Sequence, residues 1–85
     1  MENALFLTIK RKYFDLIASG KKKIEYRDKS EYWRQRMNRK YDKVIIRNGY
    51  RLDSPMLIAE CAGINRRGKY YKIMIGDIIC KKYGN

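Results

Sequence analysis

Hydrophobic and polar residues follow one another in short segments along this chain, and the period of each segment predicts its secondary structure. The segment Leu5–Ile9 places its aliphatic side chains at every second position, which predicts a strand. The next segment has a helical period, because Phe14, Ile17 and Ala18 form one apolar stripe. Gly20 is well placed to end this short helix in a left-handed conformation. The chain is therefore predicted to begin with a strand and a helix.

The segment Lys23–Arg27 returns to a period of two, with Glu25 on its charged face. In most sheets such a face is solvated, and the cations beside Glu25 screen its charge. Asp28 or Ser30 can then cap a second short helix, on which Trp33 lies. A second strand and a second helix are therefore predicted.

The second half of the chain contains only strand patterns. The clearest strand is Asp42–Arg47, which an Asn-Gly turn follows. Two later strands are predicted, one from about Met56 to Ile64 and one that begins with Tyr70–Ile75 and continues into Ile78–Cys80 after a bulge or bend at Gly76-Asp77. The order strand, helix, strand, helix and three strands predicts an α+β fold, in which a small mixed sheet curls into a barrel.

Length and charge then limit the classes of function. The chain has 85 residues, so we expect residues 1–85 to form a single domain. Its formal net charge is +12, and almost all of this excess lies in the segments Lys10–Lys23 and Arg34–Arg51. Aromatic residues are interleaved with these cations, at Tyr26, Tyr32, Trp33, Tyr41 and Tyr50. Cations beside stacking rings favour RNA or another nucleic acid as the partner over a merely soluble basic surface.

Several absences exclude other functions. The chain has no His, and Cys61 and Cys80 lack metal-ligand spacing, so we expect no metal and no cofactor. Both cysteines lie in apolar stretches and are interpreted as buried, reduced thiols, with a single secreted disulfide as the alternative. Apolar runs of four or five residues predict no membrane span. No export signal is visible at Met1–Ala4, which favours a cytoplasmic location.

One motif extends this interpretation. Gly20, Lys22, Glu25 and Arg27 fill the pattern GxKxxExR, and the chain from Leu5 to about Ile79 resembles the small bacterial and phage-type members of the ASCH domain family. Other matching segments are Tyr32-Trp33, Tyr41–Val44, Arg47–Tyr50 and Tyr71–Gly76. The resemblance implies a PUA-like β-barrel of about five strands with two short helices, a cleft between barrel and helices, and a link to RNA.

The same resemblance raises an enzymatic alternative. Some ASCH relatives are reported as ribonucleases or as amidohydrolases of an acetylated cytidine, and the latter resemble a KxxTxR pattern with a threonine nucleophile. Glu25 stands where that threonine would be, so the nucleophile is missing. An RNA- or nucleoside-processing hydrolase would have to use Glu25 as a general base, with Lys22 or Tyr50 assisting. Because neighbouring cations stabilise the Glu25 carboxylate, they weaken it as a general base, and binding is the leading hypothesis.

The candidate binding residues are Lys22, Glu25, Arg27, Trp33, Arg36, Arg47, Asn48 and Tyr50. The first three form either a structural ion-pair network or a cleft in which the cations hold a phosphate and the carboxylate meets a base edge. Asn48 and Tyr50 either line the same cleft or belong to an ordinary turn. Trp33 and Arg36 form either the opposite wall or a core tryptophan covered by an arginine. The sequence leaves the oligomeric state open.

Overall fold

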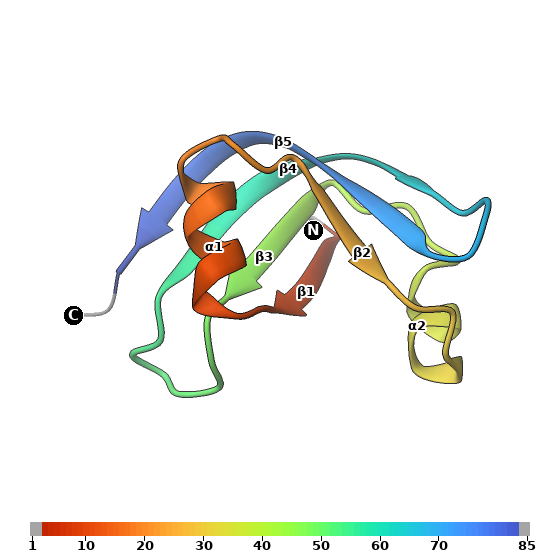
Figure 1. The fold of residues 1–85 in the computed structure, drawn as a ribbon, viewed down its shortest axis with the longest axis horizontal. Coiled ribbons are helices and arrows are strands. Elements are labelled where there is room, and N and C mark those ends of the chain that lie inside the picture. The colour runs from red at the N-terminus through yellow and green to blue at the C-terminus, as the bar shows by residue number, and fades with distance from the viewer. Residues whose placement is uncertain (1–2, 84–85) are drawn as a thin grey trace.

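Five strands and two helices follow one another in the predicted order in the computed structural model, which describes residues 3–83. The elements are β1 (Ala4–Thr8), α1 (Arg11–Ala18), β2 (Ile24–Arg27), α2 (Glu31–Arg36), β3 (Lys43–Arg47), β4 (Met56–Asn65) and β5 (Tyr71–Lys82). All strands join one mixed sheet in the order β1-β3-β4-β5-β2, in which only β1 and β3 are parallel. The sheet curls into a half-barrel (Figure 1), which confirms the predicted α+β class.

The long strands β4 and β5 carry the irregularity that helps to bend the sheet. The register shifts between Ala59 and Cys61, because β5 places Gly76 and Asp77 opposite Glu60 alone. A Cβ on Gly76 would lie 3.2 Å from the carbonyl oxygen of Glu60, so this close approach favours glycine. The predicted bulge or bend is therefore a bulge, and β5 continues through it to Lys82.

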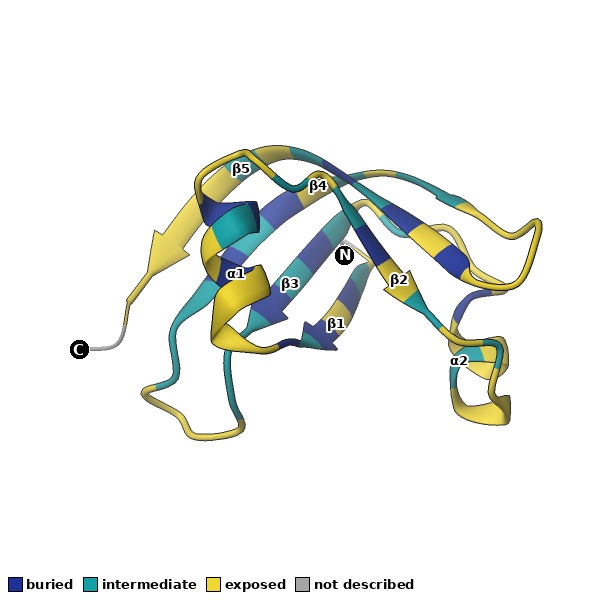
Figure 2. Ribbon diagram, viewed as in Figure 1, coloured by how far each residue is buried: buried dark blue, intermediate teal, exposed yellow. Residues whose placement is uncertain are grey.

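The apolar core lies between the sheet and the helices (Figure 2). Its buried residues are Leu5, Leu7, Ile9, Phe14, Ile17, Ala18, Met37, Val44, Ile46, Leu57, Ala59, Tyr71, Ile73 and Ile75. The helix α1 buries the predicted stripe, and Gly20 follows it at a φ of 81°. The Lys81 amine donates a hydrogen bond of 2.9 Å to the carbonyl of Ala18, which ties β5 to the end of α1.

The helix α2 lies at the end of the half-barrel away from α1 (Figure 1) and is attached mainly through the chain that follows it. None of its own six residues is buried, but Met37, directly after it, is 1% exposed within the core. The Arg66 guanidinium donates to the carbonyls of Met37 and Arg39, at 2.6 and 2.9 Å. At its start, the Ser30 hydroxyl accepts the Trp33 N–H at 3.5 Å, so Ser30 is the capping residue.

The cysteines only partly follow the prediction. Both are free thiols, but Cys61 is half-buried and Cys80 is exposed. The prediction of a buried thiol is wrong for Cys80, because β5 runs on beyond the four residues that pair with β2 and this part of the strand is open to solvent. Within residues 3–83, no helix is long and apolar enough to cross a membrane.

We expect Met37→Ala to lower the free energy of unfolding by about 2–4 kcal/mol, because it removes the buried anchor that follows α2. The matched control is Leu52→Ala, since Leu52 is 96% exposed and its truncation is expected to change stability by less than about 0.5 kcal/mol. Urea denaturation measures both values. Equal stability of the two variants would contradict the anchoring of α2 through Met37.

Candidate functional site

The charged face of β2 points into the half-barrel. Glu25 is only 8% exposed, whereas Tyr26, on the opposite face of the strand, is 47% exposed. The alternation predicted for this strand is present, but Glu25 on its charged face is buried, whereas such a face is solvated in most sheets. The physical reason is that Glu25 meets its counter-charges inside the fold, and a buried carboxylate requires such partners.

Two cations neutralise this carboxylate, and we call Lys22, Glu25 and Arg27 the Glu25 cluster. The Nη1 of Arg27 donates to Oε2 of Glu25, and the Nζ of Lys22 lies 3.5 Å from Oε1. Lys22 also donates a hydrogen bond of 2.5 Å to the carbonyl of Ile24. Both carboxylate oxygens therefore face a cation, and the cluster pairs its own charges with one positive charge in excess.

Arg27 also joins the two edges of the sheet. The strands β1 and β2 lie at opposite ends of the strand order, but Nη2 of Arg27 donates a hydrogen bond of 3.0 Å to the carbonyl of Thr8 in β1. Its guanidinium also lies 5.4 Å from the centre of the Trp33 ring in α2. One side chain thus connects β1, β2 and α2.

The other candidates lie on β3 and the loop after it. The Asn48 side chain donates a hydrogen bond of 3.0 Å to the carbonyl of Ile9, and the carbonyl of Arg47 accepts the Ile9 N–H at 2.8 Å. Both residues therefore hold the end of β1, close to the carbonyl that Arg27 binds. Tyr50 is 89% exposed in the loop between β3 and β4. The structure brings Lys22, Glu25, Arg27 and Trp33 together, and it leaves Tyr50 apart from them.

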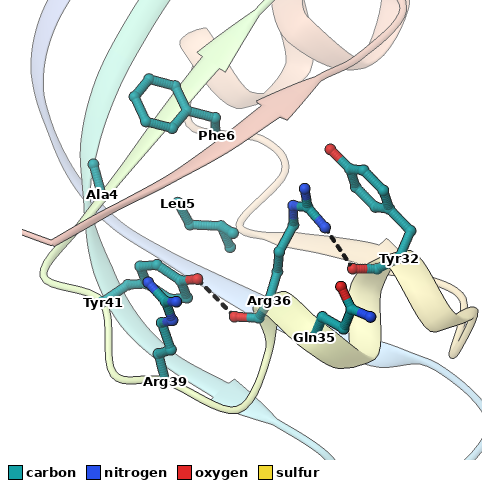
Figure 3. Close-up of a pocket in the computed structure, with 8 residues that line it drawn as sticks. All are labelled: Ala4, Leu5, Phe6, Tyr32, Gln35, Arg36, Arg39 and Tyr41. Carbon is teal, nitrogen blue, oxygen red and sulfur yellow. Dashed lines mark hydrogen bonds between the residues drawn. The ribbon is translucent and has the colours of Figure 1, made fainter.

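A second arrangement lies between β1 and α2, in a pocket of about 440 Å³ that we call the α2 pocket (Figure 3). Its lining residues are Ala4, Leu5, Phe6, Tyr32, Gln35, Arg36, Arg39 and Tyr41. The Arg36 guanidinium lies 3.6 Å from the centre of the Tyr32 ring and donates to the Tyr32 carbonyl at 2.9 Å. The Tyr41 hydroxyl donates to the carbonyl of Arg36 at 2.6 Å, which fixes the end of the helix beside the pocket.

The α2 pocket is positively charged. Two guanidinium groups and no carboxylate line it, and the Arg39 side chain makes no hydrogen bond or ion pair with any residue in the range 3–83. A neighbouring pocket of about 340 Å³ shares Arg39 and adds Lys40 and Arg66, with Asp42 as its one carboxylate. Unlike the Glu25 cluster, this surface offers cations that the fold does not neutralise.

Sequence reasoning selected Arg36 from the α2 pocket and missed Phe6, Tyr32, Gln35 and Arg39 as site residues. Two features of the sequence could have indicated some of these residues. Phe6 occupies an outward position of a strand whose aliphatic side chains point inward, and it is 66% exposed. Tyr32 and Arg36 are four residues apart, which is the spacing that brings side chains together on a helix. Arg39 follows α2 in an irregular segment, so no periodicity could place it.

The part of the chain between residues 3 and 83 contains no group of three or more His, Cys, Asp or Glu side chains that could hold a metal ion. The hydrolase alternative assigned catalysis to Glu25, with Lys22 or Tyr50 assisting. The structure pairs Glu25 with Lys22 and Arg27, whereas Tyr50 lies in the loop between β3 and β4.

A curled, five-stranded mixed sheet with two helices, and with a Lys–Glu–Arg cluster at the edge strand, defines an α+β half-barrel domain. The family model of the ASCH domain matches residues 7–82, and the chain belongs to this family. The match confirms the resemblance predicted from the GxKxxExR motif. ASCH domains are PUA-like domains, a class usually linked to RNA binding. A comparison with curated proteins found no match.

We expect Arg27→Ala to lower the free energy of unfolding by about 3 kcal/mol, because it leaves Glu25 buried with Lys22 alone and removes the bond to Thr8. Arg51→Ala is the control, since the Arg51–Asp53 pair is exposed and its loss is expected to cost less than about 0.5 kcal/mol. Urea denaturation of both variants checks the difference. If Arg27→Ala were as stable as the control, Arg27 would not close the sheet.

Proposed function

We propose that this ASCH domain binds single-stranded RNA, with the α2 pocket at the centre of the interface. The observation that carries the proposal is the pair of guanidinium groups at this pocket, one stacked on Tyr32 and the other without an acidic partner among the described residues. A cation that the fold leaves unpaired is free to bind an anionic ligand. The link of the family to RNA supports this polymer as the source of the anion.

The form of the surface favours a single strand over a duplex. Single-stranded RNA exposes its bases, which stack on aromatic rings and on arginine planes, while cations follow the phosphates. The α2 pocket combines both elements, since Tyr32 and Arg36 form a stack and Arg39 lies at the same pocket. Its volume of about 440 Å³ falls within the range of roughly 300–1,000 Å³ found for small-ligand sites.

The proposal gives different roles to the candidate residues. Arg36 contacts RNA directly, and Trp33, which packs edge-to-face on Tyr32 at 4.8 Å, supports the stack. The Glu25 cluster positions Trp33 through Arg27 and does not meet the ligand. Arg47 and Asn48 hold the end of β1. Tyr50 belongs to the loop between β3 and β4, which lies away from α2 (Figure 1), so it stays outside the proposed centre.

The contacts of Glu25 support binding over the hydrolase alternative. A general base needs a free carboxylate oxygen within reach of the proton that it abstracts. Here Arg27 occupies Oε2 and Lys22 lies beside Oε1, and the side chain is nearly excluded from solvent. The α2 pocket, by contrast, has no carboxylate in its lining. The enzymatic alternative therefore has less support than binding.

The binding of a single-stranded RNA is expected to depend steeply on salt. If about five cations reach phosphates, the logarithm of the association constant falls with the logarithm of salt concentration at a slope of about −3.5. Fluorescence anisotropy with a labelled oligonucleotide at several salt concentrations measures the slope. A slope indistinguishable from zero, or an absence of binding at low salt, would overturn the proposed function.

Replacement of Arg39 tests where the RNA lies. We expect Arg39→Ala to weaken binding and to make the salt slope shallower by about 0.7, because one phosphate contact is lost. Arg51→Ala removes the same charge from the loop between β3 and β4, away from α2 (Figure 1), and serves as the matched control. The same anisotropy titration compares the two. Equal slopes for both variants would place the RNA elsewhere on the basic surface.

A further inference from the structure

The free edge of β1 borders the α2 pocket. In a parallel ladder, alternate residues direct their backbone groups to the partner strand and away from it. The Ile9 N–H binds Arg47 in β3, whereas the Thr8 carbonyl points outward and accepts from Arg27. Phe6, two residues before Thr8, therefore directs its N–H and its carbonyl to the same free edge, where it lines the pocket. No bond within the described residues engages these two groups.

The opposite side of the pocket carries a flat cation. The Arg36 guanidinium lies against the Tyr32 ring with one face, and its donation to the Tyr32 carbonyl holds it there. Figure 3 shows this side chain rising from α2 toward β1, beside the space that the pocket residues enclose. The other face of the guanidinium plane is therefore available to a flat ligand. Arginine planes are surfaces on which unstacked RNA bases pack.

We infer that the α2 pocket holds one unstacked nucleobase, which packs on Arg36 and forms hydrogen bonds with the backbone N–H and carbonyl of Phe6. The inference rests on the proposed function and adds to it the chemistry by which the ligand is recognised. Every nucleobase presents a donor beside an acceptor on one of its edges, which matches the backbone pair of Phe6. Arg39, at the same pocket, binds the phosphate of that nucleotide.

A free strand edge can also bind an extended peptide, which adds a strand to the sheet. The lining of the pocket favours the base. An added peptide strand would bring its own backbone and side chains past Arg36 and Arg39, and it would need acidic residues to match them. A single nucleotide can bind all of these groups. Its base forms hydrogen bonds with the Phe6 backbone and packs on the Arg36 guanidinium, and its phosphate binds Arg39. These contacts favour a nucleic acid with bases over a bare sugar-phosphate chain, and they do not discriminate among the four bases.

Two oligomers of the same length and charge separate base recognition from phosphate attraction. One is an eight-residue oligouridylate, and the other is an abasic ribose-phosphate chain. We expect the wild-type protein to bind the first roughly 5-fold to 150-fold more tightly, the range that stacking of one base gives. Arg36→Lys keeps the charge and removes the plane, so it is expected to lose most of this preference. Arg34→Lys, at an exposed position of the same helix, is the control and is expected to keep it.

The backbone contact has its own readout. In an NMR titration, the amide resonance of Phe6 is expected to move with uridine 5′-monophosphate and to stay in place with ribose 5-phosphate. Equal affinity for the two oligomers, or a preference that Arg36→Lys leaves intact, would overturn the base pocket while RNA binding stands. Failure of both oligomers to bind at low salt would overturn the proposed function as well. A polyglutamate of equal charge that binds as tightly as the oligouridylate would assign the edge to an acidic protein instead.

Discussion

The guanidinium of Arg27 closes a sheet whose two edge strands do not pair with each other. It reaches the Thr8 carbonyl of β1 from the end of β2, and it brings the Trp33 ring of α2 to the same place. This position is possible only because Glu25, on the same face of β2, supplies the opposite charge inside the fold. Lys22 completes the neutralisation of that carboxylate. This buried network holds the start of α2, as Met37 and Arg66 hold its end, and both contribute to the pocket between α2 and β1.

The cations of this basic chain therefore divide into two kinds. The cations of the Glu25 cluster are largely shielded from solvent and form ion pairs with a carboxylate, so their charge is neutralised within the fold. Arg36 and Arg39 lie at a pocket without a carboxylate, where an anionic ligand gains their full attraction. The family motif lies in the first group, and the surface proposed for RNA lies in the second. In the proposed function, the motif supports the binding surface and does not form it.

The sequence predicted the order of all seven elements, because each segment has a clear period and clear ends, such as Ser30 before α2 and Gly20 after α1. It also predicted two faces for β2, but it left open whether the charged residues form an ion-pair network or line a cleft. The period of hydrophobic and charged residues cannot by itself show which face of a strand is buried when ion pairs neutralise the charges on one face. Cys80 was predicted to be buried but is exposed, because its exposure depends on how far β2 extends beside β5. Arg39 was missed because it lies outside any periodic segment.

The local pattern of the chain thus determined its secondary structure, its α+β class, its family and its excess of positive charge, because each of these depends on composition or on neighbours a few residues apart. Tertiary structure alone decided which charges are neutralised. Glu25 and Thr8 lie on opposite edges of the sheet and meet through Arg27 only when the sheet curls. The pocket, likewise, exists only where β1 and α2, 22 residues or more apart in the chain, come together. Charge can be counted in a sequence, but its pairing depends on distances that only the fold sets.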